Sequence, residues 1–515
     1  MSIWISALIL ATSDETKLLA IISDPISSDG NITATVMNQE YVIDSITDAN
    51  TYIVTMSASA AGTDSTEGGS SVTAAYQISI GLDTTVIGTG WGVDTYGTGG
   101  WGSAATGAST DITKQLRIWS QAPFGEDLIA NIRNGGIYKW DASGGLTARS
   151  VNLTALSGAD TAPTICRTIV VAAESRHLIA LGCDPTDDIG TQDPLLIRWA
   201  DAETLITWTP DTTNTAGSLR LNTGSQIITG LATKRDILVW TDTSLNSVSY
   251  VGPPFFFGTK LISSNTSIMG PKSAVEVDGI TYWMGSDNFY LYDGATKTIP
   301  CTLRDDVFTN INRNQTYKTF ACTNVGDSEV TWFYCTTTDE ITHYVTFNYT
   351  QQVWYGGTMA RTAWIDRNHN DYPIAAGTDN YLYNHELGLD DGSTNPVSAI
   401  SSFCESSAFE PIPGDGWRFT FLNRLIPDIT FSGSEADNPA AIITLTPKNF
   451  PGGGVGTGDA STVTRSASTP VETYTKEAYI RLRGRSYVYR VENSSVGVRW
   501  RDGNPRVEAR ADGRR

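Results

Sequence analysis

The sequence is poor in the side chains that most catalytic and metal sites need. Its 515 residues include only four histidines, too dispersed to indicate a metal site or a catalytic triad: His177, His343, His369 and His385. The patterns GxSxG, HExxH and GxxxxGK[ST] do not occur. The sequence therefore predicts no catalytic residue, no cofactor site and no metal site, and we expect a protein that is not an enzyme.

Long hydrophobic runs are missing too. No stretch of about 18 apolar residues occurs, so the sequence predicts no membrane-spanning segment. Residues 3–11 are apolar but lack a basic flank, which favours a first strand over a signal peptide.

No CxxC pair occurs among Cys166, Cys183, Cys301, Cys322, Cys335 and Cys404. This spacing favours buried thiols in a reducing compartment, with scattered disulfides as the alternative.

Basic residues are scarce over most of the chain. The formal net charge is −20, and Lys17 is the only basic residue before Lys114. Because nucleic-acid binding is driven by Lys and Arg that displace counterions from phosphates, such a surface disfavours it. Residues 476–515 differ, with 11 Lys and Arg against 5 Asp and Glu, which leaves 24 against 50 for residues 1–475. An acidic body therefore ends in a basic segment.

Amphipathic helical patterns are scarce, whereas strand and turn residues are abundant: 48 Gly, 14 Trp and 21 Tyr. Residues 280–284 and 289–292 are aromatic and β-branched runs around a Gly-Ser-Asp-Asn turn, which predicts a hairpin. Related strand–turn–strand units occur at 128–140, 177–199, 237–250, 330–349 and 374–384. Repeats spaced roughly 35 to 60 residues apart indicate a β-propeller of about five to six blades. An irregular β-sandwich is the alternative.

These patterns predict an all-β chain of four parts. Residues 1–84 are expected to form a small β-domain with a flexible loop over 57–75, and residues 85–114 a Gly- and Trp-rich linker. Residues 115–395 form the predicted propeller, and residues 396–515 a carboxyl-terminal sandwich-like β-domain with an extended loop at 451–470 and a basic tail. Glycines on both sides of Trp91 and Trp101 favour indoles that dock the linker on the propeller, with a sugar-binding shelf as the alternative.

Two groups of acidic and amide residues have the hard oxygen ligands that calcium prefers: Asp184, Asp187, Asp188 and Asp193, and Asp366, Asn368, Asn370 and Asp371. Neither fits a twelve-residue calcium loop, so solvated turns are the better interpretation.

The carboxyl-terminal segment carries the candidate docking residues. Residues 478–483 alternate apolar and basic, so one face should be buried and the other should present arginines. Residues 500–515 are turn-rich and charged, either as a solvated tail or as an arm that docks on a neighbour. The predicted subunit-docking residues are Arg499, Arg501, Arg506, Arg510, Arg514 and Arg515.

A family resemblance appears when several segments are taken together. They are GIYKWDASGG, TQDPLLIRWAD, NTAGSLRLNTGSQIITGL, YVGPPFFFG, YWMGSDNFYLYDG, VWYGGTMARTAWIDR, YPIAAGTDNYLYNHE, TLTPKNFPGG and VRWRDGNPRVEARADGRR. They resemble packaged-DNA-stabilisation and tail-nozzle (tail tubular B-like) structural proteins of tailed bacteriophages. The likeness covers residues 85–515, whereas residues 1–84 match less well.

The resemblance implies a propeller-bearing subunit of the virion tail, made in the host bacterial cytoplasm. It implies six copies around a central channel below the portal and adaptor, retaining packaged DNA and passing it at ejection without specific binding. It carries over no catalytic residue. The alternative is a propeller that binds or cleaves carbohydrate through Trp91, Trp101 and carboxylates at the channel mouth, an analogy at the level of the fold alone.

Overall fold

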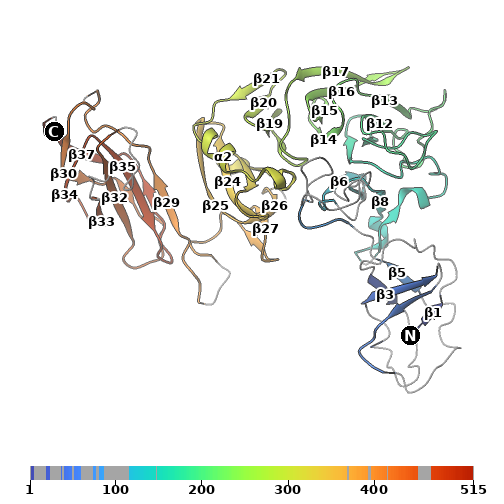
Figure 1. Cartoon of the computed structure of the whole chain (residues 1–515), viewed down its shortest axis with the longest axis horizontal. Coiled ribbons are helices and arrows are strands. Elements are labelled where there is room, and N and C mark those ends of the chain that lie inside the picture. Colours follow the sequence, from blue (N-terminus) through green and yellow to red (C-terminus); the bar gives the residue numbers. More distant parts are fainter. Residues whose placement is uncertain are drawn as a thin grey trace, which may run out of the picture. The chain divides into compact units, whose positions relative to one another are not determined.

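The computed structural model describes residues 2–4, 19–23, 36, 40–48, 51–59, 73–76, 80–85, 115–146, 148–367, 370–391, 396–414, 416–450 and 465–513. The described chain is all-β, as predicted. It divides into two compact units, residues 1–383 and residues 384–515 (Figure 1).

The amino-terminal part of the first unit contains a five-stranded antiparallel sheet with strand order β1-β4-β3-β2-β5. Its strands are β1 (Ser2–Trp4), β2 (Leu19–Ser23), β3 (Glu40–Asp48), β4 (Thr51–Val54) and β5 (Thr73–Tyr76). The loop expected over residues 57–75 is wrong at its end, because Thr73 to Ala75 pair with β2.

Six antiparallel sheets follow within the described residues, each formed by strands consecutive in the chain. The first three contain β6 (Trp119–Phe124), β7 (Asp127–Ile132), β8 (Ile137–Trp140) and β9 (Val151–Asn152); β10 (Thr168–Ala172), β11 (His177–Leu181), β12 (Leu196–Trp199) and β13 (Gly217–Arg220); and β14 (Ile227–Ala232), β15 (Ile237–Thr241), β16 (Ser244–Gly252) and β17 (Phe256–Ser264). The others contain β18 (Ala274–Val277), β19 (Ile280–Met284), β20 (Phe289–Tyr292) and β21 (Thr296–Ile299); β22 (Phe320–Asn324), β23 (Glu329–Cys335), β24 (Ile341–Asn348) and β25 (Val353–Thr358); and β26 (Arg361–Ile365), β27 (Ile374–Gly377) and β28 (Leu382–Asn384).

The six predicted strand–turn–strand units are confirmed, and each forms the second and third strands of one sheet. The hairpin predicted at 280–292 has the predicted bounds, since Thr281 pairs with Tyr292 and Met284 with Phe289. Aromatic and β-branched side chains pack well on a pleated, half-buried surface, which explains why these two strands carry the strongest signal in each sheet.

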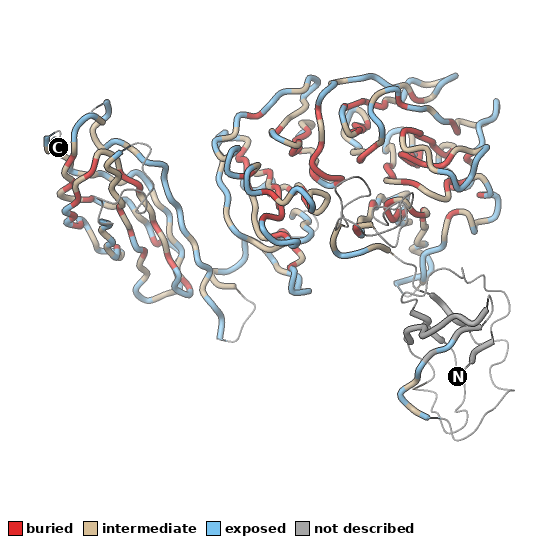
Figure 2. The backbone as a smooth tube through the Cα atoms, in the orientation of Figure 1, coloured by how far each residue is buried: buried red, intermediate tan, exposed pale blue. Residues whose placement is uncertain are grey.

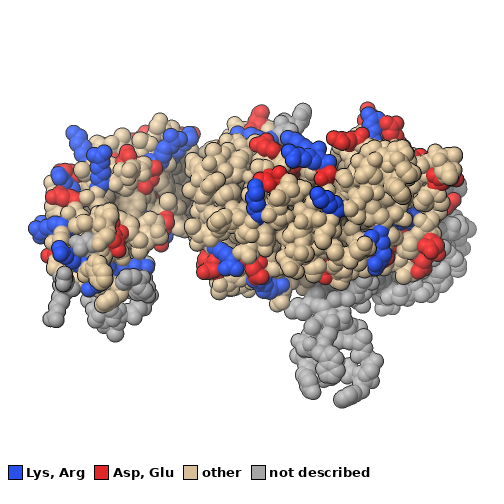
Figure 3. All heavy atoms as spheres, turned by 90° about the horizontal axis from the view of Figure 1, so that it is seen from above, with Lys and Arg blue, Asp and Glu red and all other residues tan. Residues whose placement is uncertain are grey.

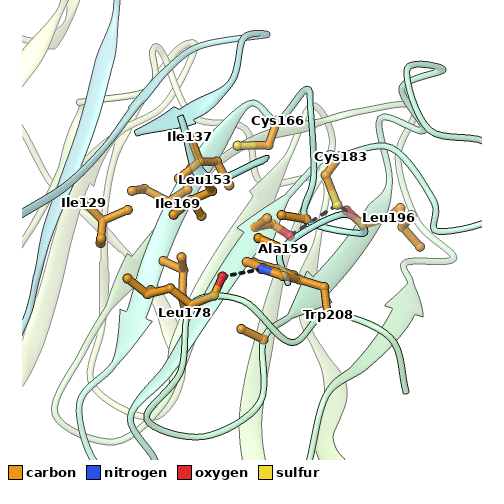
Figure 4. Close-up of a cluster of buried hydrophobic side chains, with 14 residues drawn as sticks. Ile129, Ile137, Leu153, Ala159, Cys166, Ile169, Leu178, Cys183, Leu196 and Trp208 are labelled. Atoms are coloured by element: carbon orange, nitrogen blue, oxygen red, sulfur yellow. Dashed lines mark hydrogen bonds between the residues drawn. The ribbon is translucent and has the colours of Figure 1, made fainter. Parts of the chain in front are cut away.

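Successive sheets share hydrophobic cores. Each of four clusters of buried side chains draws residues from two sheets that follow each other in the chain. In a fifth cluster, buried residues of the fifth sheet pack against the half-buried Trp364 of the sixth. Figure 4 shows the cluster between the first two sheets, to which one sheet contributes Ile129 and Ile137, and the other Ile169, Leu178 and Leu196. Figure 2 shows the buried segments running through the strands of these sheets. Because the second to fifth sheets each contribute to two clusters, each of them needs a neighbour on both faces.

The carboxyl-terminal unit encloses one core between two sheets, ordered β29-β35-β32-β33 and β34-β30-β37, and adds the pair β31-β36. The strands are β29 (Ser402–Glu405), β30 (Thr420–Ile426), β31 (Ile429–Thr430), β32 (Ala440–Lys448), β33 (Ala467–Glu472), β34 (Ala478–Gly484), β35 (Ser486–Asn493), β36 (Arg501–Asp502) and β37 (Arg506–Ala511). The loop expected at 451–470 is wrong at its end, where residues 467–470 belong to β33.

The helices within the described residues are short: α2 (Arg304–Asn310) and the 3-10 helices η1 (Ala142–Gly144), η2 (Leu153–Ala155), η3 (Arg313–Lys318) and η4 (Val325–Asp327). Over the described ranges, no helix has the length and apolar character needed to cross a membrane.

All six cysteines are free thiols. The expectation of burial holds for Cys166, Cys183, Cys322 and Cys335. It is wrong for Cys404, which is exposed on the edge strand β29, and only partly right for Cys301, which is half-buried.

Candidate docking surface of the carboxyl-terminal unit

The outer face of the sheet β34-β30-β37 carries a group of arginines. Along β34, Ile480 and Leu482 are 3% and 4% exposed and pack in the core, whereas Tyr479 between them is 72% exposed. Strand residues alternate between faces, so Tyr479, Arg481 and Arg483 share the outer face, as the apolar–basic alternation predicted.

The strand register extends this face across all three strands. Phe421 on β30 lies between Arg483 on β34 and Arg510 on β37. In the next outward row, Arg424 lies between Tyr479 and Glu508. We refer to the outward side chains of these strands as the arginine face: Phe421, Arg424, Tyr479, Arg481, Arg483, Arg506, Glu508 and Arg510.

Acidic groups at the face neutralise part of its charge. Arg424 donates to Glu477 at 2.9 Å and to Glu508 at 3.1 Å. Hydrogen bonds from Tyr479 and Arg424 lower the pKa of Glu477, and the bond to Glu477 raises the pKa of Arg424. The Arg483 guanidinium donates to Asp512 at 2.6 Å. These exposed pairs order the face but contribute little to stability.

Three arginines of the face keep their charge available. Arg481, Arg506 and Arg510 are exposed, and none forms an ion pair with another residue in the part of the chain that the structure describes. The Arg510 guanidinium carbon lies 4.9 Å from the centre of the Phe421 ring, a cation–π contact that holds the side chain on the sheet. Figure 3 shows basic groups interspersed with acidic ones on the visible side of this unit. A planar guanidinium held in this way is suited to bidentate binding of carboxylates.

The predicted docking residues divide into three groups. Arg506 and Arg510 lie together on the arginine face. Arg499 and Arg501 are exposed but belong to the segment around β36, which pairs with β31. Arg514 and Arg515, with the predicted aromatic docking residues Trp91 and Trp101, lie outside the described residues.

The prediction of a free tail or arm over residues 500–515 is wrong for Arg506–Ala511. These residues form β37, which pairs along its length with β30 and turns Val507 and Ala509 toward the core.

Arg424 is not among the docking residues that were predicted from the sequence. A bulge between Leu422 and Arg424 shifts the alternation of β30, so a simple period of two places this residue on the wrong face.

The acidic groups considered for calcium have other roles. Asp184 is fully buried rather than solvated, and its carboxylate accepts bonds from Thr164 N, Thr164 Oγ1 and Gly190 N at 2.6–3.2 Å. Asp366 accepts bonds from Thr323 Oγ1 and Val325 N, while Asn368 lies outside the described residues. Among the residues that the structure describes, no group of three or more His, Cys, Asp and Glu is placed to hold a metal.

Comparison with known proteins gives only weak likenesses. No protein-family model matches the sequence, and no curated protein matches it. Among solved structures, the extracellular domain of the one component system BT4673 from B. thetaiotaomicron is 11% identical with a TM-score of 0.33, over 55% of this chain and 32% of that chain. Hsv2 of Kluyvelomyces marxianus is 8% identical with a TM-score of 0.30, over 56% and 73%. The AfRom2 CNH domain is 12% identical with a TM-score of 0.30, over 56% and 90%. Likenesses at this level assign neither a fold family nor a function to the chain.

Proposed function

We propose that the chain is a structural, non-enzymatic subunit of a phage tail nozzle, assembled as a ring around the channel through which packaged DNA is retained and then passed. The observation that carries the proposal is the pairing of an acidic body with an arginine face on one polypeptide. The sequence resemblance to tail-nozzle proteins supplies the biological setting.

The charge distribution favours contacts between copies. A cationic face on one unit and an acidic surface elsewhere on the chain are complementary but distinct, so a contact between them is head-to-tail rather than twofold. Head-to-tail contacts close into rings when the rotation between copies allows it. The six copies implied by the resemblance would carry a formal charge of −120, and an acidic channel wall repels DNA instead of retaining it by adhesion.

We also propose that the six sheets from Trp119 to Asn384 are the blades of a β-propeller. The supporting contacts are those between first strands, since β6 adjoins β10, β10 adjoins β14, β18 adjoins β22 and β22 adjoins β26. Shared cores between successive sheets fit the same arrangement. In a propeller, the first strand of each blade lies nearest the axis, and neighbouring blades cover each other's faces.

The test is the native mass of the full chain, with negative-stain imaging, for wild type and two matched variants. Arg506→Glu with Arg510→Glu reverses two charges of the arginine face while keeping β37. Lys234→Glu with Arg235→Glu makes the same change at exposed residues beside β15. Deleting residues 506–515 is a poor test, because it removes a strand from the sheet.

We expect rings of wild type and of the Lys234/Arg235 variant, and monomers or smaller species of the Arg506/Arg510 variant. Ring formation should also weaken as salt is raised, because exposed charge pairs are screened. Rings that form equally in all three proteins would contradict docking through the arginine face. A monomeric wild type that binds or cleaves glycans would replace the nozzle proposal with the carbohydrate alternative.

A further inference from the structure

Two cationic side chains and a tyrosine lie near the starts of first strands, and a third cation lies in a turn of the first sheet. Arg167 immediately precedes β10, Lys272 precedes β18, and Arg133 follows β7 in the turn that leads to β8. Tyr317, in η3, lies just before β22. Because β10, β18 and β22 are the first strands of their sheets, Arg167, Lys272 and Tyr317 all lie near the starts of first strands.

Arg133 links three of the sheets. It comes from the first sheet, its Nη1 donates to the carbonyl oxygen of Ile228 on β14 at 2.7 Å, and its guanidinium carbon lies 5.3 Å from the centre of the Tyr317 ring. The side chain is only 5% exposed. Arg133 therefore belongs to the first sheet and contacts both the third sheet and the segment that leads into the fifth. These three sheets converge at Arg133.

Arg167 reaches the same region from the second sheet. Its Nη1 donates to Gln226 Oε1 at 2.5 Å and to the carbonyl oxygen of Ile227 at 3.2 Å. Its Nε is buried and has no hydrogen-bond partner among the described atoms. An unpartnered N–H of a buried cation is costly unless a ligand or water accepts from it.

Lys272 lies beside the start of β22, and its side chain is exposed. Its backbone carbonyl accepts from Ala321 N at 2.8 Å, which fixes the start of β18 against β22. Surrounding protein atoms and then the charge of Arg133 lower the pKa of its amine, although the side chain keeps an exposed surface. The amine is therefore accessible to a dissolved anion and lies close enough to Arg133 for the two charges to repel.

The three cations lack a direct counter-charge. None forms an ion pair within 4.0 Å with a carboxylate in the described ranges. The negative charge of Asp242 attracts Arg167 from beyond ion-pair distance, and the Asp242 carboxylate already accepts hydrogen bonds from Ser225 N and Ser225 Oγ. Burial, followed by repulsion from Arg133, lowers the pKa of Arg167 to about 10, so the side chain is still charged at neutral pH. Arg133 is buried, Arg167 is half-buried and Lys272 is exposed, and neighbouring like charges without a counter-ion repel one another.

We propose that the cationic cluster formed by Arg133, Arg167, Lys272 and Tyr317 binds a phosphate-type oxyanion. The anion supplies the missing counter-charge and accepts from Arg167 Nε and Lys272 Nζ. Guanidinium forks and lysine amines are the common protein ligands of phosphate oxygens. The source of the phosphate group is either free inorganic phosphate or the backbone of a nucleic acid that reaches the cationic cluster.

The test uses inorganic phosphate as the probe and Lys272→Met as the main variant, since the Lys272 side chain makes no hydrogen bond or ion pair with the described residues. The control is Lys260→Met, which removes an exposed lysine of β17. Binding is followed by titration calorimetry and by thermal unfolding, with chloride at equal ionic strength as the reference salt. We expect phosphate to raise the Tm of wild type and of Lys260→Met, and to bind Lys272→Met at least about tenfold more weakly.

In phosphate-free buffer, Lys272→Met should unfold at or above the wild-type Tm, because one of three repelling charges has gone. No phosphate effect on wild type, or an equal effect on wild type and Lys272→Met, would overturn the proposal. A short single-stranded oligonucleotide then separates the two sources. Displacement of phosphate by the oligonucleotide assigns the cationic cluster to a nucleic-acid backbone, and phosphate binding without displacement assigns it to the free anion.

Discussion

The six sheets between Trp119 and Asn384 and the carboxyl-terminal unit both consist of antiparallel strand pairs, but the pairs differ in range. Every strand pair of the six sheets joins neighbours in the sequence. In the carboxyl-terminal unit, β29 pairs with β35 and β30 with β37, so that Arg424 bonds Glu508 across 84 residues. The strand pairing of the six sheets is specified by local sequence. The strand pairing of the carboxyl-terminal unit depends on strands from distant parts of the sequence, which come together only when the whole unit folds.

The hydrophobic cores of the two regions differ in the kind of side chain that fills them. In the six sheets, large aromatic residues fill the spaces between sheets, and Trp240 meets Trp283 edge to face at 5.6 Å. In the carboxyl-terminal unit, a single cluster of mostly aliphatic side chains lies between two sheets, and Tyr487 is its fully buried aromatic residue. The first region should therefore depend most on individual indoles, and the second on hydrogen bonds that tie distant strands together.

The largest effect is expected from Trp332→Ala, in the core between the fourth and fifth sheets. Trp332 is fully buried, contacts Phe289 at 4.9 Å between ring centres, and donates from Nε1 to the carbonyl oxygen of Ser273 at 3.1 Å. Removing a buried indole leaves a cavity and an unpaired carbonyl, so we expect a loss of about 3–5 kcal/mol in the free energy of unfolding. Urea unfolding followed by circular dichroism measures it.

The control for Trp332→Ala is Trp417→Ala in the carboxyl-terminal unit, where the indole is 78% exposed. Its expected effect is within about 0.5 kcal/mol. Equal losses from the two substitutions would contradict the assignment of the main aromatic core to the space between the sheets.

A smaller effect is expected from Tyr487→Phe, which tests the long-range ties of the carboxyl-terminal unit. The buried Tyr487 hydroxyl donates to the carbonyl oxygen of Thr420 at 2.6 Å and so connects β35 with β30. We expect the substitution to cost about 1 kcal/mol at pH 8. Tyr381→Phe, at a tyrosine that is 68% exposed, is the control and should have no measurable effect.

The same hydroxyl predicts a dependence on pH. Burial raises the pKa of Tyr487 from 10.0 to about 12. Above pH 10 the unfolded chain loses this proton while the folded chain keeps it, so the contribution of Tyr487 to stability is complete below pH 10 and is lost as pH rises toward 12. Denaturant titrations at pH 8 and 11 should show a smaller fall for Tyr487→Phe than for wild type. Parallel falls would show that the Tyr487 proton does not stabilise the fold.

The contrast between the regions also explains what could be predicted from the sequence. The hairpin of β19 and β20 was predicted with its bounds, because both strands and their turn lie within thirteen residues, Ile280 to Tyr292. Strand β37 was missed, because its residues are charged or small and its partner β30 is distant. Strand β33 contains Pro470, a residue that edge strands tolerate but that argues against a strand in the sequence.

Alternation alone does not specify a strand, and the candidate site was only partly predicted. Residues 496–500 alternate like a strand, but Gly497 has a φ of 71°, which turns the chain. The count of charges identified Arg506 and Arg510. It could not place them beside Arg424 and Arg481, since that requires the register of three strands from distant parts of the sequence.

The smallest effect concerns the thiols, whose reactivity should differ between the regions without a change in stability. Cys404, on β29 of the carboxyl-terminal unit, is exposed, whereas the thiols of the six sheets are buried or half-buried. Burial raises the pKa of Cys166 and Cys322 well above 9.0 and that of Cys301 to about 11, so none of these thiols is ionised at pH 8, and Cys166 and Cys322 are also inaccessible. Partial burial and then Asp502 also raise the pKa of Cys404, so its reaction should be slow but selective.

A thiol reagent at pH 8 should therefore modify one cysteine in the native chain and all six in urea, counted by mass spectrometry. Cys404→Ser should abolish the native reaction and leave the unfolding curve unchanged, whereas Cys301→Ser should leave the native reaction intact. A thiol between Cys166 and Cys335 that reacts as fast as Cys404 would mean that the cores between the sheets open in the native state. The distinction between sealed cores in the first region and an open edge strand in the second would then fail.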